Sequence, residues 1–400
     1  MTPWLSILGI GEDGVEGLSP AARRLIGTAR LVVGGERHLA LAGSSIRGET
    51  LAWPRPMTDA LPRLLACRGE SVVVLASGDP FCFGVGSLLA RAVPMSEILC
   101  LPAPSAFSLA CARLGWALQD ATLLSVCGRP VEALLPALQP GARLLVLCAD
   151  ETSPASIQSL LDAQGFGGST VTLLEALGGP QERITRLAGP PRDPVARLNM
   201  LAIALVAGPG ARPIPLSCGL PDRFFACDGQ LTKSEIRAAT LAALAPCQGE
   251  TLWDIGAGSG SIGIEWMLRH PANRAVALEP RPDRARRALG NALSLGVPEL
   301  AVIEAEAPAG LAGLPAPDAV FVGGGAGAPG LLDAAWTALR PGGRLVVNAV
   351  TIETESLLFA AHARWGGSLT RLSIERLDVV GRMHGFRPAM TVTQYAATRP

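Results

Sequence analysis

Residues 253–265, WDIGAGSGSIGIE, restrict the possible fold more than any other part of the chain. A short apolar run ends at Ile255, three alternating glycines follow, and an apolar segment with helical spacing comes next. This pattern is typical of the strand, tight turn and helix of a βαβ unit, where glycines let the backbone approach a flat ligand closely. The sequence therefore predicts a nucleoside-type ligand at this turn. Glu279, at the end of the next apolar run, is placed to bind ribose hydroxyls.

The glycines allow two interpretations of that ligand. Gly258, Gly260 and Gly263 satisfy the G-x-G-x-x-G pattern of dinucleotide sites. Asp254, however, stands at the tip of the strand, where a carboxylate favours a cation and opposes a diphosphate. S-adenosylmethionine (SAM) carries a sulfonium, an ammonium and no phosphate, so we favour SAM over NAD(P); a turn without a ligand is a third possibility. The predicted SAM contacts in this segment are Asp254, Gly256, Ala257, Gly258, Ser259, Gly260 and Glu279.

The composition narrows the class of protein. Of 400 residues, 49% are hydrophobic and 17% charged, which predicts two or three domains with large buried cores. Basic and acidic residues both number 34, so no net charge favours nucleic acid or an anionic membrane. The nine cysteines show no C-x-x-C spacing, which predicts free thiols in a reducing compartment and no metal site. No apolar run reaches the ~18 residues that span a bilayer. A soluble cytoplasmic protein is expected.

A segment rich in proline and glycine, residues 207–216, predicts a linker between a domain at 1–206 and a domain at 217–400. Apolar runs alternate with helical segments in both domains, which predicts largely parallel α/β sheets. The predicted strands are 4–8, 31–34, 71–76, 143–148, 200–206, 251–255, 274–279, 300–304, 318–322 and 343–349. Two segments with period-two alternation, 370–375 and 390–395, predict an antiparallel pair at the sheet edge.

Region 215–351 resembles the decarboxylating precorrin-6B C15-methyltransferase family. The matching segments are GLPD (219–222), LTKSEIR (231–237), the glycine segment (253–265), EAPAGL (306–311), PDAVFVGG (317–324) and GGRLVVNAVT (342–351). The resemblance implies a class I Rossmann-like SAM-dependent methyltransferase domain. It implies that Thr232, the glycine loop, Glu279 and Ala307 contact SAM. Glu306 is also a predicted contact, although the family usually has aspartate at this position.

The N-terminal half resembles the tetrapyrrole methylase family. Turns follow its predicted strands at 9–11 (GIG), 77–84 (SGDPFCFG) and 102–107 (PAPSAF), and later segments resemble the precorrin C5-methylating branch: SVCGRP (125–130), ADETSPASI (149–157), EALGGPQERI (175–184) and LNMLAIAL (198–205). The resemblance implies a two-lobed fold that binds SAM between its lobes. The implied contacts to SAM and substrate are Gly9, Gly11, Gly78, Asp79, Phe83 and Ser105.

Together the halves resemble the fused precorrin-6Y C5,15-methyltransferase (decarboxylating) family of cobalamin biosynthesis. The implied reaction methylates precorrin-6B at C5 and C15 with two SAM, removes the carboxyl group of the C12 acetate side chain and gives precorrin-8X. The implied ligands are one SAM per domain and a small-molecule tetrapyrrole, with no metal, and related folds imply a homo-oligomer. An NAD(P)-dependent oxidoreductase and a non-catalytic tetrapyrrole carrier are the alternatives.

Candidate catalytic residues follow from the chemistry. Methyl transfer from a sulfonium requires alignment of donor and acceptor, and loss of CO2 from an acetate arm requires an electron sink, which the macrocycle supplies. Proton donors for the decarboxylated carbon are predicted among Glu265, Asp222 and His384. Arg237 and Arg382 are predicted partners of substrate carboxylates. The arginine cluster at 281–287 predicts a solvated helix face, and Thr232 with Glu235 predicts a helix capping box.

Overall fold

The computed structural model describes residues 3–400 and divides into two compact units. The first contains Met1–Val131 and Gln139–Arg212, and the second contains Glu132–Leu138 and Pro213–Pro400. The division at Arg212 lies inside the predicted linker, and no helix or strand is described between Leu205 and Pro221. Within residues 3–400, none of the helices has the length and apolar character needed to cross a membrane.

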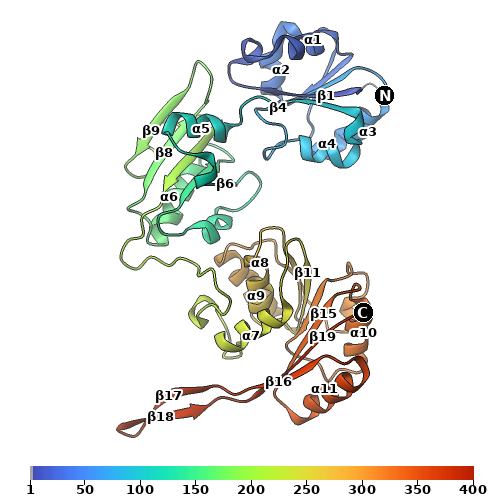
Figure 1. Ribbon diagram of the computed structural model, residues 1–400. Helices are drawn as coiled ribbons and strands as arrows, with labels where there is room; N and C mark the ends of the chain where they lie inside the picture. Colours follow the sequence, from blue (N-terminus) through green and yellow to red (C-terminus); the bar gives the residue numbers. More distant parts are fainter. Residues whose placement is uncertain (1–2) are drawn as a thin grey trace. The chain divides into compact units, whose positions relative to one another are not determined.

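The first sheet of the N-terminal unit is parallel throughout, as predicted. Its strand order is β3 (Glu49–Ala52), β2 (Leu31–Gly34), β4 (Val72–Ser77), β1 (Leu5–Ile10) and β5 (Ile98–Leu101). Helices α1 (Pro20–Thr28) and α2 (Glu36–Ala42) contribute to a core on one face, and α3 (Leu61–Ala66) and α4 (Gly86–Ala92) to a core on the other (Figure 1). Because both faces are covered, every residue of β1 is buried.

The second sheet of this unit is mostly antiparallel, which corrects the prediction of a parallel arrangement. Its order is β6 (Ala121–Ser125), β7 (Arg143–Leu147), β10 (Asn199–Ala204), β8 (Thr170–Glu175) and β9 (Arg183–Leu187), and only β6 and β7 run parallel. Helix α5 (Ala106–Leu114) packs on one face of β7, β8 and β10, and residues on their other face are buried too. Apolar residues along these strands therefore indicate that both faces of the sheet are covered. They do not indicate whether neighbouring strands run parallel or antiparallel.

The C-terminal unit has a seven-stranded sheet. Its order is β13 (Ala301–Ile303), β12 (Arg274–Leu278), β11 (Thr251–Ile255), β14 (Ala319–Val322), β15 (Arg344–Ala349), β19 (Val392–Thr398) and β16 (Ser368–Leu372). The first five strands are parallel, and β19 is antiparallel to both β15 and β16. The predicted antiparallel pair is thus confirmed. Strand order reverses at β11, so the glycine segment follows the strand at a topological switch point, where ligands of open α/β sheets bind.

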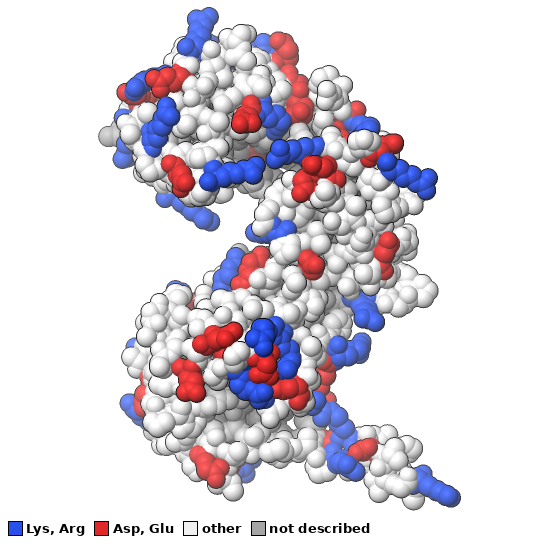
Figure 2. All heavy atoms as spheres, turned by 180° about the vertical axis from the view of Figure 1, so that it is seen from behind, with Lys and Arg blue, Asp and Glu red and all other residues white. Residues whose placement is uncertain are grey.

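Five helices accompany this sheet: α7 (Ser234–Leu244), α8 (Ser261–Leu268), α9 (Pro282–Ser294), α10 (Leu331–Ala338) and α11 (Ile352–Trp365). A hairpin of β17 (Glu375–Val380) and β18 (Met383–Pro388) extends away from the sheet (Figure 1). No pattern in the sequence had predicted this hairpin. Elsewhere, basic and acidic side chains are interspersed over the face in Figure 2, in keeping with their equal numbers.

Candidate active sites

The glycine turn of the C-terminal unit joins β11 to α8. Gly256 and Gly260 have positive φ angles of 69° and 76°, and a Cβ atom at Gly256 would lie 2.8 Å from the carbonyl oxygen of Gly324. Gly258 also has a positive φ, 57°, but no described atom lies within 4 Å of the position its Cβ would take. The turn therefore packs against the turn after β14 and leaves open space beside Gly258, where a flat ligand can approach the backbone.

Glu279, at the end of β12, holds this turn in place. Its carboxylate is 3% exposed and accepts hydrogen bonds from the backbone N–H groups of Gly258 (2.8 Å) and Arg281 (3.1 Å). The Gly256 and Ala257 N–H groups both donate to the carbonyl of Leu278 (3.0 and 3.1 Å). The predicted ribose-binding carboxylate thus adjoins the open side of the turn.

Asp254 lies beneath the turn and is 1% exposed. One carboxylate oxygen accepts the Gly263 N–H at 2.9 Å, and the other is buried without a partner among residues 3–400. Burial, opposed by the Gly263 hydrogen bond and reinforced by nearby Glu279, raises the pKa of this carboxyl to about 7. Asp254 therefore fixes the first turn of α8 and keeps one unpartnered oxygen below the glycine turn, and its contact with the ligand stays a prediction.

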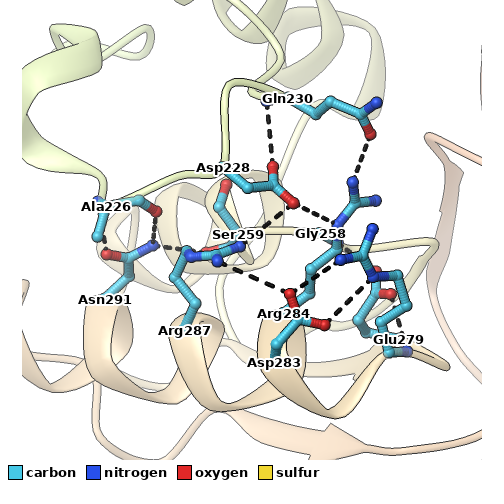
Figure 3. Close-up of polar contacts among 11 residues, drawn as sticks. Ala226, Asp228, Gln230, Gly258, Ser259, Glu279, Asp283, Arg284, Arg287 and Asn291 are labelled. Carbon is cyan, nitrogen blue, oxygen red and sulfur yellow. Dashed lines mark hydrogen bonds and ion pairs between the residues drawn. The ribbon is translucent and has the colours of Figure 1, made fainter.

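A second set of contacts fastens residues 226–230 to α9 (Figure 3). Asp228 accepts from Arg284 at 2.8 Å, which lowers the pKa of that carboxyl to about 2, and Gln230 accepts from the same guanidinium at 2.5 Å. Asn291 exchanges two hydrogen bonds with the Ala226 backbone and donates to the carbonyl of Ser259 in the glycine turn, all at 2.9 Å. The segment before α7 is thus tied to the glycine turn.

The prediction of a solvated arginine face on α9 is therefore only partly right. The side chains of Arg284 and Arg287 are only 18% and 23% exposed, and both face Asp228. Arg281 and Arg286 are exposed, as expected. No sequence signal pairs Asp228 with Arg284, which lies 56 residues away, so this contact could not be predicted.

Three of the predicted catalytic residues form one ion-pair network. Arg237 and Glu265 are both 0% exposed and are joined at 2.8 Å, and Arg237 also donates to Asp222 at 3.0 Å. Arg237 further donates to the carbonyls of Leu220 and Thr232, and Glu265 accepts the N–H groups of Gly219 (2.7 Å) and Leu220 (3.0 Å). Arg237 and Glu265 have no exposed surface in this structure, where they position the 219–232 segment.

The other predicted residues of this unit lie in different places. The capping box is corrected, because Lys233 rather than Thr232 is the N-cap of α7 and its side chain makes no capping hydrogen bond. Glu306 is exposed after β13, and Ala307 is half-buried beside it. His384 and Arg382 are exposed in the β17–β18 hairpin, outside the parallel part of the sheet. The structure therefore groups Asp222 with Thr232 and leaves His384 apart from them.

Three turns meet at the carboxyl ends of β1, β4 and β5 in the N-terminal unit. The Gly78 N–H donates to Ile10 (3.2 Å), and the Ala103 N–H donates to Gly78 (3.1 Å). A Cβ atom at Gly9 would lie 1.9 Å from the Gly78 carbonyl oxygen, and one at Gly78, whose φ is 52°, would lie 2.7 Å from the Pro104 oxygen. The predicted glycines therefore allow the turns to contact each other directly.

The remaining predicted residues of this unit border those turns. Asp79 is half-buried and accepts the Phe81 N–H at 2.9 Å, and Ser105 caps α5 by accepting the Ser108 N–H at 3.1 Å. Phe83 has a positive φ of 54°, is 54% exposed and meets Phe107 with ring centroids 5.7 Å apart. An exposed aromatic residue in a disfavoured backbone conformation is a feature that clusters at functional sites. Gly11 is half-buried, beside Asp13.

A polar cluster, which the sequence did not predict, lies beside these turns. Arg37 donates to Ser77 at 2.7 Å, lies 2.9 Å from the Nε2 atom of His38 and forms an ion pair with Glu12. Burial, together with the charge of Arg37, lowers the pKa of His38 to about 4. His38 is therefore neutral at pH 7. Arginine, histidine and serine next to strand ends are too common in sequences to have marked this cluster.

Comparison with known proteins identifies the family. The chain is 54% identical over 401 residues to a precorrin-6Y C(5,15)-methyltransferase [decarboxylating] of Sinorhizobium sp, covering 100% of this chain and 97% of the relative. The chain belongs to the precorrin-6Y C5,15-methyltransferase (decarboxylating) family. Residues 5–189 match the tetrapyrrole (corrin/porphyrin) methylases, and residues 223–399 match the precorrin methyltransferase domain. The resemblance and the fold class predicted from the sequence are confirmed.

Two shorter relatives correspond to parts of the chain, both from Salmonella typhimurium. A cobalt-precorrin-7 C(5)-methyltransferase is 31% identical over 180 residues, 45% of this chain and 88% of the relative. A cobalt-precorrin-6B C(15)-methyltransferase (decarboxylating) is 33% identical over 162 residues, 40% of this chain and 83% of the relative. The family therefore identifies a SAM-dependent decarboxylating C-methyltransferase, and the oxidoreductase and carrier alternatives are set aside.

Proposed function

We propose that the two units divide the reaction of this family between them. The N-terminal unit methylates C5, and the C-terminal unit methylates C15 and removes the carboxyl group of the C12 acetate, converting precorrin-6B to precorrin-8X with two SAM. The observation that carries the proposal is that each unit has its own set of glycine turns at the carboxyl ends of parallel strands. Two separate SAM sites fit this arrangement better than one.

The C-terminal turn suits SAM in two respects. The open space at Gly258 lies beside the Glu279 carboxylate, a pairing that suits a nucleoside. The unpartnered buried oxygen of Asp254 contributes negative potential, which favours a cation. When bound, SAM supplies an activated methyl group, so the protein needs mainly to align the acceptor carbon and exclude water.

In the N-terminal unit, the same task falls to turns held by backbone contacts. Gly9 and Gly78 bring the three turns together, and exposed Phe83 offers an apolar face to a macrocycle. Apolar contact with a flat ring system is a common way to orient a ligand without charge. We propose that Phe83 contacts the tetrapyrrole and that the Gly78–Asp79 turn contacts SAM.

The remaining expectations belong to the same proposal. Neither methylation is proposed to need a metal, and a cytoplasmic location is proposed on the cysteine pattern of the sequence. A homo-oligomer is supported by the β17–β18 hairpin, whose Leu377, Met383 and Phe386 are 62%, 75% and 71% exposed. An exposed apolar ribbon of this kind is typical of a protein–protein contact surface, which another copy of the chain could occupy. Sedimentation of the full chain with and without Phe386→Asp tests this point.

Product analysis of the full chain tests the division of labour. Precorrin-6B incubated with the protein and methyl-labelled SAM should gain two labelled methyl groups, release one CO2 and yield two S-adenosylhomocysteine molecules. Calorimetric titration with S-adenosylhomocysteine should fit two sites per chain. A product that gains one methyl group, or a titration with one site per chain, would refute the two-site proposal.

A further inference from the structure

Lys233 is the only lysine among the 34 basic residues of the chain. It stands between Thr232 and the first residue of α7, and its side chain is 48% exposed. As the N-cap of α7 it makes no capping hydrogen bond, and a cation at this end of a helix is opposed by the helix dipole. Local helix stability therefore does not account for a lysine here, and such local conflicts are expected at functional positions.

The position of the Lys233 ammonium is set by a chain of contacts that leads from a half-exposed ion pair to a buried one. Asp222 binds Lys233 through one oxygen at 3.2 Å and Arg237 through the other at 3.0 Å. Arg237 is in turn held by Glu265 of α8, the helix that begins at the glycine turn. In the middle of the same segment, Asn291 ties Ala226 to Ser259 of that turn. Residues 219–233 are thus fastened to the glycine turn through Asn291 and to helix α8 through Arg237.

Residues 219–233 contain two cations, Arg223 and Lys233. Arg223 is exposed and lies over the Phe224 ring, 5.6 Å from its centroid, whereas Lys233 adjoins Thr232 and the start of α7. An ammonium has three donor hydrogens, and within residues 3–400 the ammonium of Lys233 has one partner, Asp222. Arg237 is completely buried and makes four hydrogen bonds, and Arg376 is engaged by Glu235 of α7. Two donors of Lys233 can therefore reach a carboxylate beside Thr232, which is a predicted SAM contact.

We propose that Lys233 binds a ligand carboxylate at the C-terminal active site, with Asp222 and Arg237 as positioning residues. This inference rests on the proposed function, whose two ligands both carry carboxylates: the methionine end of SAM and the acetate and propionate arms of the tetrapyrrole. A lysine suits the site because a compact ammonium can share its donors between Asp222 and a second oxygen, whereas a guanidinium would present a larger planar fork. Binding the carboxylate requires no covalent step.

The single lysine allows a direct test on the full chain. An amine-selective acylating reagent labels Lys233 and the α-amino group, and peptide mass spectrometry quantifies the two separately. Slower labelling of Lys233 in saturating S-adenosylhomocysteine, with the α-amino rate unchanged, would assign the carboxylate to SAM. Slower labelling only when precorrin-6B is present would assign it to the tetrapyrrole. Labelling at the same rate in both cases would overturn the proposal.

Variants separate a binding role from a structural one. Lys233→Met should raise KM for the ligand concerned at least ~tenfold, about 1.4 kcal/mol, with kcat for CO2 release changed less, and Lys233→Arg should restore part of the loss. Arg286→Met, which removes an exposed cation from α9, is the control and should leave both constants unchanged. Unchanged KM values in Lys233→Met would overturn the proposal. If the unmodified chain released no CO2, the proposed function would fail, but the labelling experiment with S-adenosylhomocysteine would still report on Lys233.

Discussion

The two units build comparable turns in different ways. In the N-terminal unit, the turns after β1, β4 and β5 are joined by backbone hydrogen bonds at Gly78, with glycines where a side chain would collide. In the C-terminal unit, two buried carboxylates hold the turn, Glu279 through Gly258 and Asp254 through Gly263. The first site therefore depends on steric fit alone, whereas the second combines a close contact between Gly256 and Gly324 with hydrogen bonds to carboxylates. This difference predicts that the two sites respond to different perturbations.

The largest expected effect is steric. Gly9→Ala places a Cβ atom 1.9 Å from the Gly78 carbonyl oxygen, in a fully covered strand, so the turns must separate at a cost of about 3 kcal/mol, the upper end of the usual range for overpacking. We expect loss of C5 methylation with C15 methylation and CO2 release retained, measured by product mass. Gly27→Ala in α1, where the nearest atom is 3.9 Å away, is the matched control and should behave as the unmodified chain. Undiminished C5 methylation in Gly9→Ala would show that the turns are not sterically coupled.

The next effect is electrostatic and confined to the other site. Glu279→Gln replaces a carboxylate oxygen that accepts the Gly258 N–H, and charge-assisted hydrogen bonds of this kind contribute about 1.5–3 kcal/mol. Of the two proposed S-adenosylhomocysteine sites, the C-terminal one should weaken by roughly 10- to 100-fold in calorimetry, with the other unchanged. Glu304→Gln, an exposed carboxylate after β13, controls for the loss of charge. Equal weakening of both sites would remove the distinction between the units.

A smaller effect depends on pH. Because burial raises the pKa of Asp254 to about 7 in the folded chain, the folded state binds a proton more tightly than the unfolded state. The free energy of unfolding should therefore fall as pH rises from about 4 to about 7. Asp254→Asn should remove this slope and stabilise the chain by about 1 kcal/mol or more at pH 8, with little change at pH 4. Denaturant unfolding at both pH values measures the free energy of unfolding. If this free energy changed with pH in the same way for the variant and the unmodified chain, the prediction would be contradicted.

The smallest effect has the opposite sign and arises in the N-terminal unit. The pKa of His38 is lowered to about 4, so the unfolded chain takes up a proton that the folded chain does not. Its contribution to stability is complete above about pH 6.5 and is lost as pH falls towards 4. His38→Gln should reduce this acid sensitivity, with Tm at pH 5 closer to Tm at pH 7 by about 2 °C. The exposed His362 of α11, replaced in the same way, serves as the control.

The sequence predicted those parts of the molecule that depend on local patterns. The glycine spacing after Ile255 located a strand, turn and helix, and the family resemblance supplied the division into two methyltransferase domains. The predicted parallel direction of the strands in the second N-terminal sheet was wrong, because apolar strand residues indicate burial and not strand orientation. Long-range pairs such as Arg237 with Glu265 could not be predicted from the sequence either. Both side chains are buried, so in this structure they hold the neighbouring segment in place.

The place of β19 in its sheet has a consequence for how this unit assembles. The strand follows β15 and β16 in the chain but lies between them, so β16 has no neighbour until β19 has arrived. Until then β15 is an open edge rich in valine, the kind of edge that recruits strands from other molecules. Closure also requires contacts between residues about 50 positions apart, such as Val346 with Ala396, which slows folding. The C-terminal unit therefore keeps an aggregation-prone strand edge exposed until its last strand has been made.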